Sequence, residues 1–210
     1  MKYIVNLIRI GFLGLFIFLM INGKASLWLI LFLASLVLAV FLGRVYCGYA
    51  CLMNTFMIPT EWISKKLKLQ SDKTPKFLKN RYFAWISLGV SILLILVSRR
   101  LLQIDLPILP LWILLSILVT LRYKPEVFHN LICPFGALQR TFGRFAIFTE
   151  TVNKEACISC KLCEKVCPST AVLVRAYDNK ASIDRSLCLQ CTNCRQVCPT
   201  KAIYYGKHQQ

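Results

Sequence analysis

Eight of the eleven cysteines fall into two copies of one spacing, C-x2-C-x2-C-x3-C-P. The first copy comprises Cys157, Cys160, Cys163 and Cys167, followed by Pro168. The second begins 31 residues later and comprises Cys188, Cys191, Cys194 and Cys198, followed by Pro199. Such a run supplies three thiolates from one tight loop to an iron–sulfur cubane, which takes its fourth from elsewhere. The spacing therefore predicts two [4Fe–4S] clusters.

The fourth cysteine of each run is expected to cross to the other cluster, as in two-cluster ferredoxins. This gives two predicted ligand sets. The first set is Cys157, Cys160, Cys163 and Cys198, and the second is Cys188, Cys191, Cys194 and Cys167. Because the crossing ties the two halves together, we expect folding of this segment to be coupled to cluster binding.

Two other uses of cysteine compete with this interpretation. A disulfide framework in a secreted chain also needs many cysteines, but it does not require a regular spacing. Zinc sites more naturally pair one C-x2-C with a distant C-x2-C or with histidines. Two complete runs with both prolines favour iron–sulfur clusters over either alternative.

Four basic residues lie within or beside the cysteine loops: Lys161, Lys165, Arg195 and Lys201. A solvated charged face is the simplest explanation for them. A docking patch for an acidic partner is the alternative, because a local field of one sign attracts the opposite charge.

A second constellation pairs soft ligands at positions i and i+4. Cys47 and Cys51 form one pair, and His129 and Cys133 form the other. Together these four side chains would suit a third centre, either an iron–sulfur cluster with one histidine ligand or a single Fe or Zn ion. The alternative is that the cysteines are small buried hydrophobes and His129 is an interfacial polar residue. His208, near the end of the chain, is not expected to be a ligand.

The elements that must position these residues are largely apolar. Apolar residues make up 57% of the chain and charged residues 17%, so about half of it is expected to lie in lipid. Four apolar runs, at roughly 3–21, 26–43, 82–98 and 106–121, predict four transmembrane helices. The fourth is short, with Pro107 and Pro110 at its head, and a surface or re-entrant position is its alternative.

The charge distribution predicts the orientation. The chain has 26 Lys and Arg against 9 Asp and Glu, and eight of the basic residues fall between Arg44 and Arg81. A basic loop between apolar runs is typical of the cytoplasmic side of an inner membrane, so a membrane explains the charge better than a nucleic acid does. We expect multi-pass insertion with both termini, and every cysteine, on the cytoplasmic side. The first run lacks a convincing cleavage site and is expected to be a retained helix.

The predicted fold class is thus a membrane α-helical domain with four transmembrane helices, joined to an α+β bacterial-type dicluster ferredoxin domain. We predict a transmembrane domain over 1–124, a connecting segment over 125–148 and the ferredoxin domain over 149–210. Between the cysteine runs, Val172–Tyr177 and Ala181–Asp184 are expected to form two short strands around a turn at Asp178-Asn179.

These motifs together resemble the NapH-type family of membrane polyferredoxins, which are accessory quinol dehydrogenases; the wider group includes NosR-like and CcoG-like proteins. Gly43–Cys51 matches the first C-x3-C-P motif of the family, and Cys133–Leu138 matches the end of the second. Two positions depart from the pattern. Leu52 replaces a proline, and His129 replaces the first cysteine of the second motif. The resemblance implies quinol oxidation, and the departures imply either altered ligation or loss of the membrane-face site.

The expected function is a membrane-bound electron-transfer subunit that relays electrons between the quinone pool and a redox partner. No nucleotide-binding loop, flavin motif or haem C-x2-C-H sequence is visible, so the chain is expected to work within a larger redox complex. The expected partners are membrane lipid, other subunits of that complex and a soluble electron carrier. The alternative is a membrane-anchored ferredoxin, or a redox assembly or sensor factor, that does not react with quinone.

Overall fold

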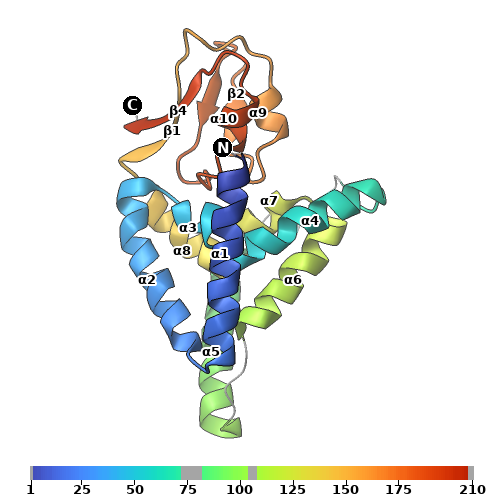
Figure 1. The fold of residues 1–210 in the computed structure, drawn as a ribbon, viewed down its shortest axis with the longest axis vertical. Coiled ribbons are helices and arrows are strands. Elements are labelled where there is room, and N and C mark those ends of the chain that lie inside the picture. The colour runs from blue at the N-terminus through green and yellow to red at the C-terminus, as the bar shows by residue number, and fades with distance from the viewer. Residues whose placement is uncertain (1, 72–81, 104–107, 208–210) are drawn as a thin grey trace. The chain divides into compact units, whose positions relative to one another are not determined.

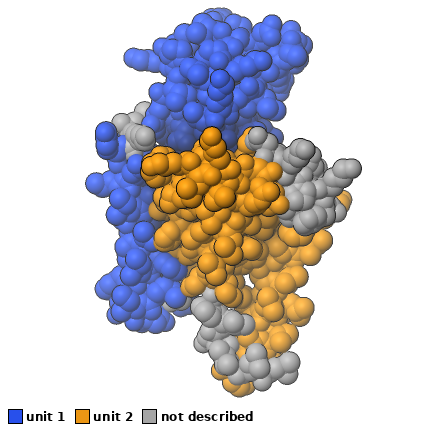
Figure 2. Space-filling model, turned by 90° about the vertical axis from the view of Figure 1, so that its right-hand side faces the viewer, with its two compact units in different colours: residues 1–51, 138–210 blue, residues 52–137 orange. Residues whose placement is uncertain are grey.

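The computed structural model describes residues 2–71, 82–103 and 108–207. Three features named above fall partly or wholly outside these residues: the basic loop beyond residue 71, the start of the fourth apolar run, and His208. By packing, the chain forms two compact units (Figure 2), which we call unit 1 (residues 1–51 and 138–210) and unit 2 (residues 52–137). The predicted domain boundaries at residues 124 and 148 stay a prediction.

Unit 1 begins with a helical hairpin of α1 (Lys2–Ile21) and α2 (Ala25–Leu42) (Figure 1). Gly23, with a φ of +67°, allows the tight turn between them, because this region of backbone space strains other residues. The ring of Trp28 packs edge-on against Phe12 and Phe16 and joins the two helices. The short helix α3 (Val45–Tyr49) follows α2 after a two-residue break.

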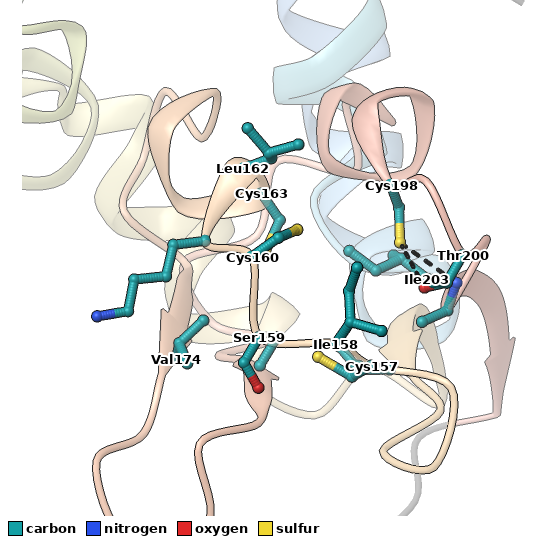
Figure 3. Close-up of a pocket in the computed structure, with 14 residues that line it drawn as sticks. Cys157, Ile158, Ser159, Cys160, Leu162, Cys163, Val174, Cys198, Thr200 and Ile203 are labelled. Atoms are coloured by element: carbon teal, nitrogen blue, oxygen red, sulfur yellow. Dashed lines mark hydrogen bonds between the residues drawn. The ribbon is translucent and has the colours of Figure 1, made fainter.

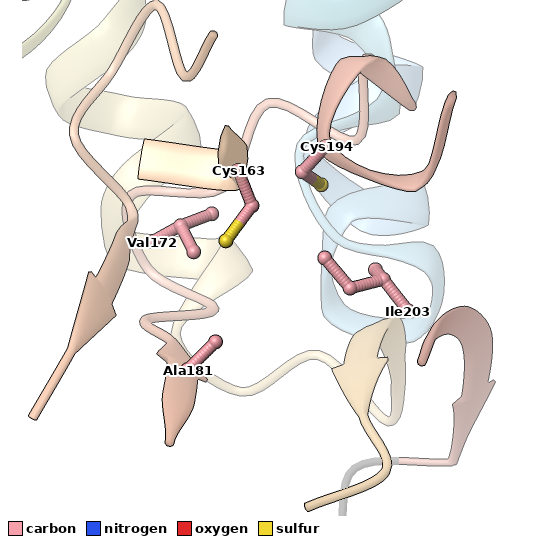
Figure 4. Packing of buried hydrophobic residues seen from close by; sticks show 5 residues of the cluster. All are labelled: Cys163, Val172, Ala181, Cys194 and Ile203. Carbon is pink, nitrogen blue, oxygen red and sulfur yellow. The ribbon is translucent and has the colours of Figure 1, made fainter. Parts of the chain in front are cut away.

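The rest of unit 1 is built from the cysteine-rich repeats. Strands β1 (Phe148–Val152) and β4 (Ile203–Lys207) pair antiparallel, and so do β2 (Val172–Val174) and β3 (Ala181–Ile183). The second pair confirms the two short strands expected between the repeats. Each repeat adds one short helix, α9 (Leu162–Lys165) or α10 (Asn193–Val197). The core between these elements contains Cys163, Val172, Ala181, Cys194 and Ile203 (Figure 4).

Unit 2 contains α4 (Leu52–Lys66), α5 (Phe83–Val97), the π-helix η2 (Ser98–Leu102), α6 (Ile108–Arg122), α7 (Pro125–Val127) and the π-helix η3 (Phe128–Ile132). The hydroxyl of Ser64 on α4 donates a 2.7 Å hydrogen bond to the carbonyl of Leu121 on α6. The hydroxyl of Ser87 on α5 donates one of the same length to the carbonyl of Ile132. Helix α8 (Pro134–Gly143) starts in unit 2 and ends in unit 1.

Each predicted apolar run forms a helix where the chain is described, but only part of the membrane prediction is supported. Two helical segments of the described chain, Tyr3–Ile21 and Phe83–Arg100, are long and apolar enough to cross a bilayer. Ser26–Leu42 and Ile108–Arg122 are shorter apolar helices. The 15 residues of α6 extend about 22 Å, against a hydrocarbon core of about 30 Å. Two candidate spans suggest membrane association and do not establish four crossings.

Candidate iron–sulfur centres

The first cysteine run and the end of the second line one pocket in unit 1 (Figure 3). Four of its lining residues are the cysteines of the first predicted ligand set: Cys157, Cys160, Cys163 and Cys198. Ile158, Lys161 and Leu162 also line it. The structure therefore brings together, around one space, the three cysteines of one repeat and the last cysteine of the other.

A second pocket of unit 1 has the reciprocal composition. It is lined by the cysteines of the second predicted set: Cys167, Cys188, Cys191 and Cys194. Glu150 on β1 and Leu189 in the cysteine loop line it as well. The crosswise arrangement expected from the spacing is thus also the arrangement of the two pockets.

The backbone of the two loops repeats as closely as their sequence does. Ser159 and Lys161 have positive φ angles, and so do their counterparts 31 residues later, Gln190 and Thr192. Side chains rarely adopt this left-handed conformation unless the surrounding structure holds it. In the second loop, the side-chain carbonyl of Gln190 accepts a hydrogen bond from the backbone N–H of Glu150, and its amide donates one to the hydroxyl of Thr149.

The fourth cysteine of each run accepts a backbone hydrogen bond on its sulfur. The N–H of Ala171 lies 3.2 Å from Cys167 Sγ, and the N–H of Ala202 lies 3.3 Å from Cys198 Sγ. Burial alone would raise the pKa of Cys198, but hydrogen bonds from Thr200 and from this backbone outweigh it, and the pKa lies below its ordinary value. N–H groups directed at cysteine sulfur favour the thiolate, the form that binds iron.

The two pockets differ in exposure to solvent. Cys160 of the first set is exposed, whereas Cys188, Cys191 and Cys194 of the second are buried. Burial raises the pKa of the Cys188 and Cys194 thiols and raises that of Cys191 to about 11. A buried thiol in apolar surroundings holds its proton. Binding of a cluster by the second cysteine set must therefore release the thiol protons of these cysteines.

The second cysteine loop is buried against the segment that follows α2. The guanidinium of Arg44, which is fully buried, donates to the carbonyls of Ser186 and Leu187 at 3.3 and 3.4 Å. Cys47 packs with Leu189 and Cys191 in one buried apolar cluster. Unit 1 thus holds the second pocket directly beside α3.

A charge pair between the buried Glu150 and the partly exposed Arg195 borders the second pocket. Arg195 Nη1 lies 3.9 Å from Glu150 Oε1, and the side chain of Glu150 is 2% exposed. Burial raises the pKa of Glu150, and Arg195 opposes this shift. Arg195, expected on a solvated face, is thus partly buried beside a carboxylate. Glu150 is not apparent as a site residue from the sequence, because β1 pairs with a strand about fifty residues away.

The donor sets fit [4Fe–4S] clusters better than single metal ions. Among the described residues, no three His, Cys, Asp or Glu side chains lie close enough together to hold one ion. A cubane instead takes one thiolate at each of four irons, and its sulfur ligands surround a larger volume than one ion occupies. Each pocket offers four cysteines and a mainly apolar wall, which suits such a group.

The four residues of the predicted third centre are all buried. Cys47 lies in α3 and Cys51 just beyond it, both in unit 1, whereas His129 lies in η3 and Cys133 follows it, both in unit 2. The sulfur of Cys133 accepts a 3.3 Å hydrogen bond from the backbone N–H of Gly136. The third centre stays a prediction.

Two family models match the chain. A model described as a 4Fe-4S binding domain matches residues 25–70 and 105–151, and one described as a 4Fe-4S dicluster domain matches residues 156–202. The first match includes all four residues of the predicted third centre, and the second includes all eight cysteines of the repeats. No solved structure matches the chain significantly.

Several curated proteins are also similar. An uncharacterised protein of Methanocaldococcus jannaschii is 28% identical over 83% of this chain and 70% of its own length. The methylamine utilization ferredoxin-type protein MauN of Paracoccus denitrificans is 27% identical over 67% of this chain, and MauN of Methylobacillus flagellatus shows the same identity and coverage. The chain matches about half the length of the MauN proteins, 53% of each. Together these matches identify the chain as a ferredoxin-type iron–sulfur protein of the electron-transfer class, with 4Fe–4S binding domains.

Proposed function

We propose that this chain is a membrane-bound electron-transfer subunit that relays electrons between the quinone pool and a redox partner. The observation that carries the proposal is the contact between the second cysteine loop and α3, where Cys47 packs with Leu189 and Cys191. Helix α3 directly follows the apolar hairpin of α1 and α2. Unit 1 therefore contains the apolar hairpin of α1 and α2 together with the two cysteine pockets.

The exposure of the apolar helices supports insertion in a bilayer. Only 22% of the apolar window in Tyr3–Ile21 and 11% of that in Phe83–Arg100 is buried within the protein. A core helix of a soluble protein would be mostly buried, so these side chains need an apolar solvent. The Nε of Arg9 on α1 donates a 2.9 Å hydrogen bond to the carbonyl of Gly48, which supports α1 as a retained part of the fold.

We assign four crossings, with both termini and the cysteine pockets in the cytoplasm, on the charge pattern of the loops. The two short helices cross by relying on the flanking polar residues and on local thinning of the bilayer. Two [4Fe–4S] clusters occupy the crosswise cysteine sets. The third centre predicted for Cys47, Cys51, His129 and Cys133 stays a hypothesis, and the 4Fe-4S binding domain model covers both pairs.

The bound clusters would supply one-electron redox chemistry. The residues of the chain stabilise the cysteine sulfurs and position the loops that carry them. Backbone N–H groups directed at Cys167 and Cys198 stabilise the electron-rich sulfurs. The buried guanidinium of Arg44 fixes the second loop on α3. Within the ferredoxin-type proteins, we propose a NapH-type polyferredoxin, and the resemblance at Gly43–Cys51 and Cys133–Leu138 supports this assignment.

The test is an anaerobic titration of the purified full-length protein with a reduced quinol analogue, followed by electron paramagnetic resonance. The proposal expects signals of reduced clusters to appear, or quinone to be reduced when the clusters are first charged by a low-potential donor. Normal reduction by dithionite together with no response to quinol or quinone would instead support a membrane-anchored ferredoxin or a redox assembly factor.

A further inference from the structure

The internal repeat places an apolar residue directly after the first cysteine of each run. In the second repeat this residue is Leu189, which is 1% exposed because α3 covers it. In the first repeat it is Ile158, at the matching position 31 residues earlier, and it is 61% exposed. The same position is therefore covered within the protein in one repeat and open to solvent in the other.

The neighbouring residues also differ in exposure between the two repeats. Cys160 is exposed and its counterpart Cys191 is buried. Leu162, 41% exposed, stands where the second repeat has the polar Asn193. Figure 3 shows Ile158, Cys160 and Leu162 around the first pocket. The first loop thus presents two aliphatic side chains beside an exposed cysteine of the predicted first cluster.

The charges of the two loops also differ. Lys161 and Lys165 are exposed in the first loop, and their counterparts Thr192 and Gln196 are neutral, whereas the acidic Glu164 has the basic Arg195 as its counterpart. The acidic residue of this loop, Glu164, uses its carboxylate to accept a hydrogen bond from the backbone N–H of Val174. The first loop thus differs from the second in presenting two exposed ammonium groups, and not in its net charge.

We propose that Ile158, Cys160, Lys161, Leu162 and Lys165, the first-loop surface, form the docking site for an acidic electron-transfer protein. Ile158 serves as the apolar anchor against this partner, as Leu189 does against α3, and the two lysines select its acidic surface. One electron passes from the reduced chain to the partner, which is reduced by one electron, and no bond is made or broken. The inference rests on the proposed function in that it defines the partner side of the relay.

The experiment uses the full chain in nanodiscs of neutral phosphatidylcholine, with a purified acidic flavodoxin as the probe. Binding is measured by calorimetry at low and high salt. We expect the double variant Lys161→Glu, Lys165→Glu to weaken binding at low salt at least about tenfold and to reduce its salt dependence, because rim charges steer and select the partner. Ile158→Ser is expected to weaken binding about fivefold or more.

Two matched controls separate docking from general effects. Lys66→Glu reverses an exposed charge on α4 of unit 2, and Leu173→Ser removes an exposed aliphatic side chain of β2. Both are expected to bind the probe within about twofold of the parent protein. Dithionite-reduced spectra that match the parent in every variant would show that the clusters are intact.

Three results would overturn the proposal: no measurable binding of the parent protein to flavodoxin at low salt, equal weakening by the controls, or unchanged binding by the first-loop variants. If those variants instead lost affinity only for vesicles containing phosphatidylglycerol, the surface would be a lipid contact. Failure of quinol to reduce the clusters, with flavodoxin binding intact, would reject the proposed quinone reaction and leave this docking site standing.

Discussion

Gly48 of α3 lies so close to the backbone carbonyl of Leu189 that a Cβ added to Gly48 would come within 2.3 Å of that oxygen. The same Cβ would lie 3.4 Å from the backbone nitrogen of Cys191. Only a residue without a side chain allows this approach, because the obstructing atoms belong to backbone. The contact sets the distance between α3 and the second cysteine loop.

We therefore predict that Gly48→Ala displaces the second loop. The expected cost is about 1–3 kcal/mol of unfolding free energy, typical of overpacking, with a changed paramagnetic signal from the second centre and an unchanged one from the first. Gly14→Ala on α1 is the control, since nothing lies within 4 Å of a Cβ added there. Identical spectra and stability in the two variants would contradict the contact.

Arg44 is predicted to be a positioning residue for the same loop. Arg44→Gln removes the charged donor that reaches the carbonyls of Ser186 and Leu187, and leaving buried groups without partners costs about 1–3 kcal/mol. We expect a lower melting temperature and faster loss of iron from the second centre. Arg144→Gln, at an exposed arginine stacked on Phe145, should leave both measurements near the parent values. Equal effects would argue against a specific role for Arg44.

The difference in burial between the pockets predicts the order in which the clusters are lost. Cys160 of the first set is exposed, whereas three of the four cysteines of the second set are buried. Oxidation by ferricyanide in the presence of a chelator should therefore remove the first centre before the second, as followed by the decay of their separate signals. Simultaneous loss, or earlier loss of the second centre, would show that exposure of the cysteines does not govern access.

Glu150 is predicted to hold down the reduction potential of the second centre. Its buried carboxylate borders that pocket, and a nearby negative charge disfavours adding an electron. Because burial raises the pKa of Glu150, the comparison is made at alkaline pH, about pH 8.5, where the carboxylate form is favoured, and there Glu150→Gln should raise the potential of the second centre by more than that of the first. The exposed Glu155→Gln serves as the control in a redox titration. A change in the reduction potential of the first centre alone would show that the Glu150 carboxylate does not act on the second centre.

The composition of the two pockets was predictable from spacing alone. A run of cysteines at fixed intervals confines three thiolates to one loop, and the repeat supplies a partner loop for the fourth, so the spacing predicts Cys198 and Cys167 in opposite sets. The pairing of β2 with β3 could also be predicted from the sequence, because the turn at Asp178-Asn179 lies between two short apolar segments.

The unequal burial of the repeats was not predictable in the same way. The two runs are alike in their cysteine spacing, and the residue after the first cysteine is aliphatic in both, Ile158 in one and Leu189 in the other. The contact that covers Leu189 depends on Gly48, a residue some 140 positions away that acts by lacking a side chain. The change from Lys161 to Thr192 and from Lys165 to Gln196 is the local signal for this difference, because a covered loop carries fewer exposed lysines; the second loop keeps one charge at Arg195.

Quantification of iron and acid-labile sulfide in the anaerobically isolated Cys47→Ser, Cys51→Ser variant tests the central claim most directly. With the predicted third centre removed, the eight repeat cysteines should retain about eight irons and eight sulfides per chain, as two four-iron clusters require. Adding Cys198→Ser should then alter the signal of the centre that contains Cys157, Cys160 and Cys163 and leave the other intact. Zinc in place of iron, or loss of the opposite centre, would contradict the crosswise arrangement of the two clusters.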